Sequence, residues 1–308
     1  MFGCRFGNLM YDLSVVILTF NSAVFIKSCL DSLFRQDYRG YEIIIVDNGS
    51  SDSTINIINE GYPGGALLIR NDRNFGASKA RNQGISCANG KWVLTLDSDV
   101  VLEDNFLSNT MGFIQNIDGD IGIVQPKILK NDKKTIYSYG IYLSVLRRFY
   151  DIGKGRSAGS EFNESCYVFG ACCAAAFYKL EMLEQIKEAA EKYFDERYFF
   201  IAEDVDLAWR AQRNGWKAML YPGALCYHDG NSSNCDFRER QYLSLRNRYY
   251  LILKNEGAAN YIKKIIPLLF YDFPRLCYLF FANPYIRKNV LRKLYISFSR
   301  FKYNNAAI

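Results

Sequence analysis

Two aspartates separated by one residue follow a short apolar run. Asp97-Ser98-Asp99 comes directly after residues 91–96, which read KWVLTL. Two carboxylates at positions i and i+2 of a turn can converge on one hard cation, and Mg²⁺ or Mn²⁺ is often held by one or two carboxylates plus substrate phosphates. A solvated turn has the same pattern, and the triplet alone favours that simpler interpretation.

A second acidic group follows the aromatic-rich segment 193–201. Glu203-Asp204-Val205-Asp206 opens a helical pattern. Acids in a first helical turn interact favourably with the helix dipole, so N-terminal capping is one interpretation. The other is that one carboxylate acts as a general base on an incoming hydroxyl. Asp206 and Arg210 stand at i and i+4, and we assign that pair to structure.

Histidine and arginine side chains could add to either group. His228 is the single histidine of the chain and follows the apolar run Ala224-Leu225-Cys226-Tyr227. A lone histidine is more often structural than a metal ligand. Arg81 and Asn82 lie on a helical pattern and could bind phosphate or ribose, although an exposed helical arginine is the commoner case. Residue type alone leaves these alternatives open.

The elements that position these residues alternate between strand and helix. Apolar runs at 13–18, 42–46, 66–69 and 91–96 predict strands, and the patterns at 23–34, 53–59 and 78–87 predict helices. Short, wholly apolar strands, each followed by a helix, indicate a parallel sheet covered on both faces, in a Rossmann-like α/β fold. Ligands of such sheets bind at the carboxyl ends of strands, where Thr19-Phe20-Asn21, Asp47 and Asp97 lie.

Known phosphate-binding loops are missing from the sequence. No G-x-G-x-x-G follows the first strand, and there is no G-x-x-x-x-G-K-[ST]. The sequence therefore argues against a dinucleotide oxidoreductase and contains no P-loop. Further along, we predict a strand over 121–125, a charged helix over 179–193 and a helix over 204–213. Without repeats or a low-complexity linker, residues 10–250 are expected to form one catalytic domain and 251–308 an extension.

Composition indicates a folded protein with a basic C-terminal end. Of the 308 residues 49% are hydrophobic and 23% charged, which excludes an intrinsically disordered chain. The start has no pattern of a signal peptide, and nine scattered cysteines without C-x-x-C indicate reduced thiols, so we expect a cytoplasmic protein. Residues 257–308 carry +8 and the remaining 256 residues −2. No nucleic-acid-binding fold is visible, so we expect no nucleic-acid partner.

The extension contains an apolar segment followed by a basic amphipathic pattern. Residues 265–281 are interrupted by Pro267, Asp272, Pro274 and Arg275, so the segment is a poor membrane-spanning helix. Between 287 and 302, basic and apolar residues alternate in a way that suits anionic lipid headgroups. A helix packed on the catalytic domain is the alternative.

Taken together, the motifs resemble family 2 glycosyltransferases with the GT-A fold, and most closely the subgroup called rhamnosyltransferase-like. Their order along residues 13–250 is the family's order, and it carries the resemblance. The motifs are Val16 to Asn21, Ile45 to Thr54, Asn74-Phe75-Gly76 with Ala80 to Gly84, Leu96 to Val100, Gly170-Ala171, Phe194 to Phe200, and Glu203 to Leu207 with Arg210, Gly215 and Trp216.

The resemblance implies a role for each candidate residue. Donor binding falls to Thr19, Phe20, Asn21, Asp47, Asn74, Arg81 and Asp97, with Asp47 accepting from the nucleobase imide. Asp99 would coordinate Mg²⁺ or Mn²⁺ bridging two phosphates, and His228 would add a metal or diphosphate contact. Asp204 becomes the proposed base, with Glu203 as the second choice, because family members invert the anomeric centre in a single displacement.

The function implied is transfer of a hexose from a nucleotide sugar to a hydroxyl of a glycan or lipid-linked glycan. The subgroup favours dTDP-rhamnose or a UDP-hexose, and relatives that use polyprenyl-linked acceptors favour peripheral contact of the extension with the cytoplasmic face of the membrane. A sugar nucleotidyltransferase is one alternative, but it needs a basic Gly-rich loop after the first strand. A non-catalytic glycan- or lipid-binding module on the same fold is the other.

Overall fold

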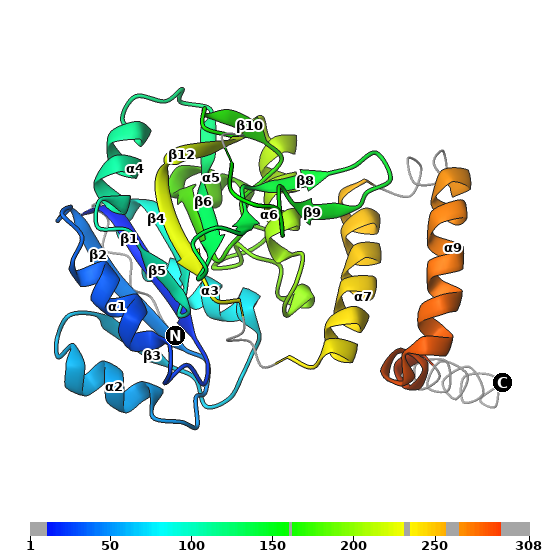
Figure 1. The fold of residues 1–308 in the computed structure, drawn as a ribbon, viewed down its shortest axis with the longest axis horizontal. Coiled ribbons are helices and arrows are strands. Elements are labelled where there is room, and N and C mark those ends of the chain that lie inside the picture. The colour runs from blue at the N-terminus through cyan, green and yellow to red at the C-terminus, as the bar shows by residue number, and fades with distance from the viewer. Residues whose placement is uncertain (1–10, 160–161, 231–234, 257–264, 291–308) are drawn as a thin grey trace. The chain divides into compact units, whose positions relative to one another are not determined.

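The computed structural model describes residues 11–159, 162–230, 235–256 and 265–290. The chain forms two compact units, Met1–Ser233 and Asn234–Ile308. Described strands of the first unit form a ten-stranded sheet in the order β10-β12-β6-β11-β4-β1-β2-β3, with β5 paired to β12 and β7 to β6. Figure 1 shows this sheet with helices on both of its faces. The α/β fold expected from the sequence is confirmed, but the sheet contains parallel and antiparallel pairs rather than mostly parallel ones.

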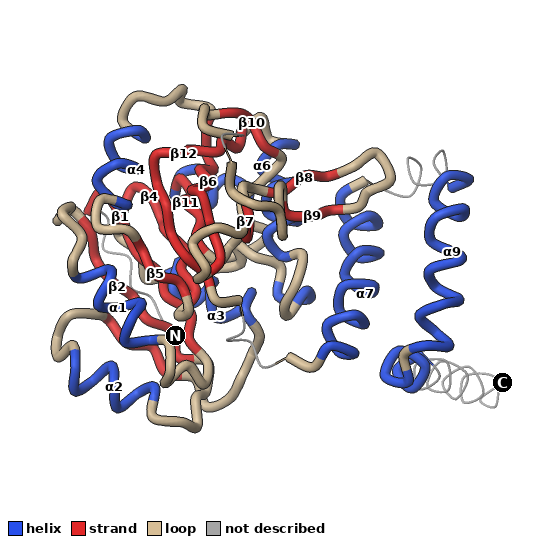
Figure 2. Tube along the Cα trace, viewed as in Figure 1, coloured by secondary structure: helices blue, strands red, loops and turns tan. Residues whose placement is uncertain are grey.

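The elements alternate as the sequence predicts over the first hundred residues, and Figure 2 shows their course. The strands are β1 (Tyr11–Thr19), β2 (Tyr41–Asp47), β3 (Leu67–Arg70), β4 (Gly90–Asp97), β5 (Val100–Leu102), β6 (Ile121–Lys130), β7 (Ile136–Ser138), β8 (Ile141–Leu143), β9 (Phe149–Asp151), β10 (Cys166–Val168), β11 (Ala175–Lys179) and β12 (Lys217–His228). The helices of this unit are α1 (Ile26–Phe34), α2 (Thr54–Gly61), α3 (Ala77–Ser86), α4 (Phe106–Ile114), α5 (Leu180–Ile186), α6 (Glu203–Arg213) and the 3₁₀ turn η1 (Glu196–Tyr198).

The centre of strand β1, Val15 to Leu18, is apolar because both of its faces are covered. Val15 and Ile17 pack in a core with α1 and α4, whereas Val16 packs in a second core that includes residues of α3, α5 and α6. Successive side chains of a strand point to opposite faces, so a strand between two helical layers is apolar on both faces where helices cover it. Near its start the buried Ser14 is satisfied by hydrogen bonds with Glu42 and Gly90 N. The strands β4, β1, β2 and β3 are parallel, which brings their carboxyl ends to one edge.

The second half of the sheet contains antiparallel strands that the sequence did not reveal. Strand β11 pairs antiparallel with both β4 and β6, and β12 pairs antiparallel with β5. The helix predicted over 179–193 is wrong in length, because α5 ends at Ile186. Residues 187–192 are charged or small and mostly exposed, so a helical extension would have no apolar face to bury.

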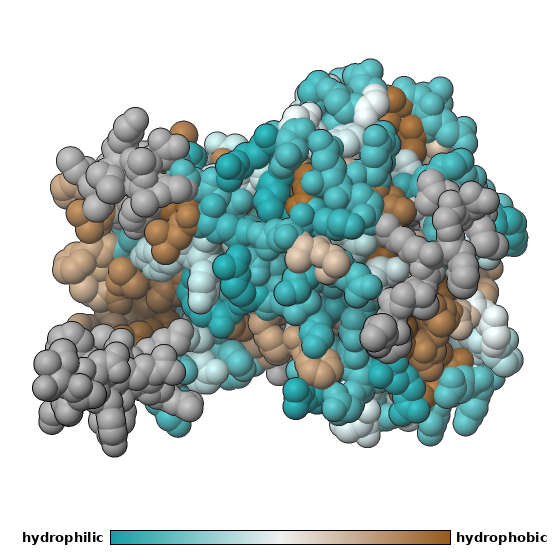
Figure 3. Space-filling model, turned by 180° about the vertical axis from the view of Figure 1, so that it is seen from behind, coloured by the Kyte–Doolittle hydropathy of each residue, from teal (hydrophilic) through white to brown (hydrophobic). Residues whose placement is uncertain are grey.

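The C-terminal unit contains the helices α7 (Phe237–Asn255) and α9 (Ile265–Ala282), and residues 284–290 are helical as well. A buried ion pair joins them, since Arg248 Nε and Nη2 lie 3.1 and 3.2 Å from the two carboxylate oxygens of Asp272. Other large hydrophobic or aromatic side chains of α9 are exposed; they are Leu269, Phe270, Phe273, Leu276, Tyr278 and Phe281. Figure 3 shows hydrophobic surface, in brown, on the described part of this unit. Within the described residues, no helix has the length and hydropathy needed to cross a bilayer. Most of the basic pattern at 287–302 lies outside the described residues.

Candidate active site

The ends of β1 and β2 form a buried polar corner. Thr19 pairs with Asp47 in the parallel register, so both side chains lie at the carboxyl edge of the sheet. Asp47 is 1% exposed; its Oδ2 accepts a hydrogen bond from Ser50 N at 3.1 Å. Asp47 Oδ1 and Thr19 Oγ1 are buried without a hydrogen-bond partner among the described residues. Because an unsatisfied buried acceptor is costly, this corner is suited to a ligand that donates a hydrogen bond.

Two other predicted donor-binding residues fasten the loops around that corner. Asn21 N donates to Ser50 Oγ at 2.8 Å, and Asn21 Oδ1 accepts from Ser51 N at 2.8 Å. Asn74 Oδ1 accepts from Asn48 Nδ2 at 2.9 Å and from Gly76 N at 2.8 Å. The loops after β1, β2 and β3 are therefore linked to one another. Phe20, the remaining predicted residue of the first loop, is partly buried.

Asp97, Asp99 and His228 form a group that could hold a metal ion. One ligand atom from each lies within 4.8 Å of the other two. His228 reaches Asp99 because the end of β12 pairs antiparallel with β5, in which His228 is opposite Val100. His228 Nε2 lies 3.0 Å from Asp99 Oδ1, and Asp99 Oδ2 accepts from Gly230 N at 3.1 Å.

The donor set of this group fits a divalent cation. His228 is 4% exposed, and its Nδ1 is buried without a hydrogen-bond partner among the described residues. Two carboxylates and an imidazole are ligands that Mn²⁺ accepts, and the carboxylates also suit Mg²⁺. The sequence alone favours a structural role for His228. Its position beside Asp97 and Asp99 in the tertiary structure makes it a candidate metal ligand.

Arg81 joins the metal-site carboxylates to the second acidic group. Its Nη2 lies 2.8 Å from Asp97 Oδ1, and its Nη1 lies 2.8 Å from Glu203 Oε1. The side chain of Arg81 is only 4% exposed. Two motifs that are 106 positions apart in the sequence therefore meet at one guanidinium group. We expected Arg81 to contact phosphate or ribose, and the structure gives it two carboxylate partners; contact with a donor stays a prediction.

Asp204 lies next to Glu203 in the first turn of α6, where Val205 N donates to its Oδ1 at 2.8 Å. Burial and the nearby charges of Glu203 and Asp151 raise the pKa of Asp204 to about 7. A general base works best when its pKa is close to the working pH. Burial raises the pKa of Glu203 as well, and its Oε2 is buried without a hydrogen-bond partner among the described residues, but Arg81 pairs with its Oε1 and opposes that rise. The geometry thus favours Asp204 over Glu203 as a group that can take up a proton.

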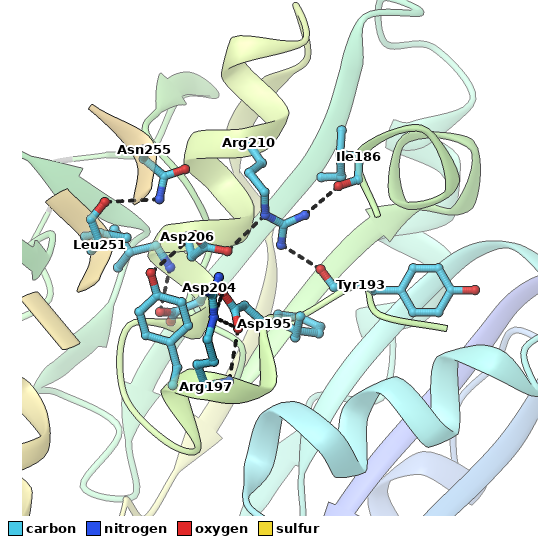
Figure 4. A network of polar contacts seen from close by, with 12 residues as sticks. Ile186, Tyr193, Asp195, Arg197, Asp204, Asp206, Arg210, Leu251 and Asn255 are labelled. Carbon is cyan, nitrogen blue, oxygen red and sulfur yellow. Dashed lines mark hydrogen bonds and ion pairs between the residues drawn. The ribbon is translucent and has the colours of Figure 1, made fainter. Parts of the chain in front are cut away.

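Asp206 and Arg210 form the structural pair predicted from their spacing. Arg210 Nε donates to Asp206 Oδ2 at 2.9 Å, and its two Nη atoms donate to the carbonyl oxygens of Ile186 and Tyr193 at 2.7 and 2.6 Å. Figure 4 shows this guanidinium between the three acceptors. These contacts hold α6 against the segment that precedes η1, and so help to place the helix that carries Asp204.

Sequence reasoning missed a cationic and aromatic group beside the metal site. The Tyr137 ring contacts His228 edge-on, with the ring centroids 4.2 Å apart. Lys154 Nζ lies 4.7 Å from the Tyr137 centroid and 2.7 Å from Asp151 Oδ2. The aromatic character of this region was visible in the sequence, but an isolated lysine and aspartate gave no signal.

A cavity of about 460 Å³ also reaches Asp99. Val24, Phe25 and Ser28 of the α1 region line it on one side, and Lys133 and Tyr227 are also among its lining residues. Asp204 does not line this cavity. A space of several hundred cubic ångströms is typical of small-molecule sites.

The chain belongs to glycosyl transferase family 2, whose sequence model matches residues 14–187, more than half of its length. It is 28% identical over 220 residues to the amylovoran biosynthesis glycosyltransferase AmsB of Erwinia amylovora, which covers 70% of this chain and 69% of AmsB. A PGL/p-HBAD biosynthesis glycosyltransferase of Mycobacterium bovis is 38% identical over 104 residues, covering 33% of this chain and 41% of that protein.

Solved structures share the fold. S. aureus TarS 1-349 in complex with UDP-GlcNAc has a TM-score of 0.55 at 21% identity, covering 79% of this chain and 67% of that one; the match spans only 40% of a longer TarS chain. The mannosyltransferase PcManGT of Pyrobaculum calidifontis, in complex with GDP-Man and Mn²⁺, has a TM-score of 0.56 at 19% identity, covering 95% and 77%. The fold of this chain is thus the GT-A fold of glycosyltransferases.

Proposed function

We propose that this protein is an inverting glycosyltransferase that moves a hexose from a nucleotide sugar to a hydroxyl of a glycan or lipid-linked glycan. The observation that carries the proposal is the Arg81 bridge, which joins Asp97 of the metal group to Glu203, the neighbour of Asp204. Donor-activating and acceptor-activating groups must lie in one site for direct transfer. Family membership and the nucleotide sugars bound by structural relatives support the same reaction class.

The donor is expected to bind at the carboxyl edge of β1, β2 and β4. Asp47 Oδ1 would accept a hydrogen bond from the imide of a uracil or thymine base, with the Thr19–Asn21 loop along the base and Asn74 and Arg81 nearby. Asp97, Asp99 and His228 would hold Mg²⁺ or Mn²⁺. A cation held there would supply Lewis-acid assistance, by neutralising charge on the departing nucleoside diphosphate.

Asp204 is proposed to accept the proton of the acceptor hydroxyl as its oxygen bonds to the anomeric carbon and the bond to the diphosphate oxygen breaks. One displacement inverts the anomeric centre, so no covalent nucleophile on the protein is needed. The raised pKa of Asp204 supports this role, because the carboxylate is both available and basic near pH 7.

The sugar and acceptor are proposed more narrowly from the sequence motifs. The rhamnosyltransferase-like subgroup favours dTDP-rhamnose or a UDP-hexose. Relatives named for amylovoran and PGL/p-HBAD biosynthesis make a cell-surface glycan acceptor a reasonable choice. We propose residues 10–250 as the catalytic domain and 251–308 as an extension, although the compact units divide earlier, between Ser233 and Asn234.

Peripheral contact with the cytoplasmic face of the membrane is proposed for the C-terminal extension. The exposed apolar side chains of α9, with Phe270 82% exposed, support it, as do Arg275, Arg287 and Lys288 in the same unit. Aromatic residues beside basic ones suit the interface of an anionic bilayer.

The direct test is a panel of nucleotide sugars, screened by thermal shift with and without Mn²⁺. A ligand that binds only the folded state raises the melting temperature by mass action. We expect one dTDP- or UDP-sugar to raise it in a Mn²⁺-dependent way, and the same donor to be consumed when a glycan acceptor is added. Product NMR should show the inverted anomeric configuration.

Two results would contradict the proposal. Selective donor binding without transfer or hydrolysis would favour the non-catalytic module. Formation of a nucleotide sugar from a sugar phosphate and a nucleoside triphosphate would favour the nucleotidyltransferase. The loop Thr19-Phe20-Asn21-Ser22-Ala23 argues against that second alternative, because it contains no basic residue and no glycine.

A further inference from the structure

Helix α3 is fastened on one side to the segment that leads into α6. Asn82 Nδ2 donates to the carbonyl oxygen of Phe194, and Phe194 N donates back to Asn82 Oδ1, both at 2.8 Å. At the start of α3, Ala77 N donates to the carbonyl oxygen of Phe199 at 2.7 Å. The side-chain amide of Asn82 thus bonds to both the N–H and the carbonyl group of Phe194, as a neighbouring strand would. These two hydrogen bonds tie the backbone of Phe194 to α3.

The segment held in this way has an unusual backbone. Phe199, Ile201 and Ala202 have φ values of 62°, 71° and 73°, in the left-handed region that residues with a side chain rarely adopt. Such conformations persist when surrounding contacts determine them, and they are concentrated at functional sites. Glu203 and Asp204 follow directly, so the place of these carboxylates depends on contacts outside α6.

Arg81 completes the connection on the side of the site. It lies one helical turn beyond Ala77 on α3, and it bridges Asp97 and Glu203 with one Nη atom for each. Both carboxylates are therefore oriented by the same rigid, planar cation, which fixes their separation. Lysine cannot reproduce this, because an ammonium group is a single point charge on a flexible stem.

We propose that Arg81 is a positioning residue, which holds Asp97 in the orientation needed for the metal ion and the Glu203-Asp204 turn in the orientation needed for the acceptor. This inference rests on the proposed function. It replaces direct donor binding as the main role of Arg81, since its side chain is buried and both Nη atoms have carboxylate partners.

The test uses Arg81→Lys, with Arg210→Lys as the matched control. Arg210 is also buried, also pairs with a carboxylate and also bonds to backbone carbonyls, but it does not contact Asp97 or Glu203. Three quantities are measured for each variant well below its melting temperature. They are the Kd for Mn²⁺ without nucleotide, the Kd for a nucleoside diphosphate without metal, and the kinetics of transfer, as kcat and kcat/KM.

For Arg81→Lys we expect the Kd for Mn²⁺ to rise and kcat to fall, each by roughly 10- to 100-fold, as is usual when a partner of a metal ligand is lost. The Kd for a nucleoside diphosphate measured without metal should change less than about threefold, because a residue that does not contact the nucleotide contributes little to its binding. Arg210→Lys should lower the melting temperature about as much as Arg81→Lys does. It should leave the Kd for Mn²⁺ within about twofold of the wild type, since the contacts that it loses are remote from the proposed metal ligands.

A folding defect is controlled by the double variant Arg81→Met with Glu203→Met. It removes the ion pair as a unit and leaves no single buried charge from that pair, which is the less damaging change. We expect the double variant to fold. Its affinity for Mn²⁺ should nevertheless be lower than that of the wild type, because Asp97 has lost Arg81 as its partner.

Two outcomes would overturn the positioning role. One is wild-type Mn²⁺ affinity in both Arg81 variants. The other is a loss of metal-free nucleotide binding as large as the loss of kcat/KM, which would mean that Arg81 binds the donor directly. If wild-type protein transfers no sugar, the proposed function fails, whereas the effect of Arg81 on Mn²⁺ affinity is still measured.

Discussion

Replacement of Asp204 by asparagine separates chemistry from binding. Asparagine keeps the size of the side chain and an oxygen that can accept from Val205 N, but it cannot accept the proton of the acceptor hydroxyl. General-base assistance typically contributes about 10²- to 10⁴-fold in rate. We therefore expect Asp204→Asn to lower kcat by that factor, while the Kd for the donor changes less than about threefold.

The pKa of Asp204 sets the expected pH dependence. With a pKa of about 7 in the free protein, kcat/KM of the wild type should fall with a slope of one below pH 7. One unit below that pKa, only about one molecule in eleven has the ionised base, so activity should be about tenfold below its plateau. Replacement of Glu203 by glutamine removes one charge that raises the pKa of Asp204. The fall of kcat/KM on the acidic side of the pH profile should therefore move to lower pH.

Stability should change in the opposite sense to activity. A carboxyl whose pKa is raised on folding contributes stability at low pH, and that contribution is lost as the pH rises through the folded-state pKa. At pH 8 the wild type carries the unfavourable charge of Asp204, and at pH 5 it does not. The loss begins above the unfolded-state pKa of 3.8 and is complete above about 7, so Asp204→Asn should raise the melting temperature more at pH 8 than at pH 5.

The assay is initial-rate transfer over pH 5–9 with a donor identified by the thermal-shift panel, together with calorimetric melting at pH 5 and pH 8. Full turnover by Asp204→Asn would remove Asp204 from the mechanism. A wild-type profile that stays flat between pH 5 and pH 8 would refute the pKa argument. A large loss of donor affinity would place Asp204 in binding rather than in proton transfer.

Three further predictions follow from single contacts. Asp47→Asn replaces a buried acceptor oxygen near the expected base, so the donor Kd should rise roughly tenfold or more with little change in kcat, measured by calorimetric titration. Gly76→Ala should lower the melting temperature, because Gly76 has φ of +90° and an added Cβ would lie 2.5 Å from the Phe199 ring; an unchanged melting temperature would contradict that packing. Phe270→Ser with Phe281→Ser should weaken sedimentation with phosphatidylglycerol vesicles but leave transfer to a water-soluble acceptor unchanged, and equal vesicle binding would exclude these residues from the contact.

The first half of the fold could be predicted from local pattern. Strands that are covered on both faces have a central run of mostly apolar residues, and this is why β1, β2 and β4 were predicted within a few residues of their observed bounds. The helix expected over 179–193 is present only over Leu180–Ile186, because charged residues with good helix propensity continue beyond the last residue that is buried. Propensity without an apolar face did not maintain the helix.

The candidate site could be predicted only in part. Asp97 and Asp99 follow a recognisable strand, so their place at the sheet edge could be inferred. No sequence motif indicates the group formed by Tyr137, Lys154 and Asp151. These residue types are common, and only their contacts in the tertiary structure bring them to the metal site.

From the amino-acid sequence alone, the family, the alternating α/β order and the two acidic motifs could be determined, because these depend on residue types close together in the chain. The tertiary structure decided which distant groups share a site. His228 reaches Asp99 through the antiparallel pairing of β12 with β5, and Arg81 reaches both Asp97 and Glu203 from α3. Long-range strand pairing and the burial of a charge between two others are properties of the whole packed unit, so no local pattern reports them.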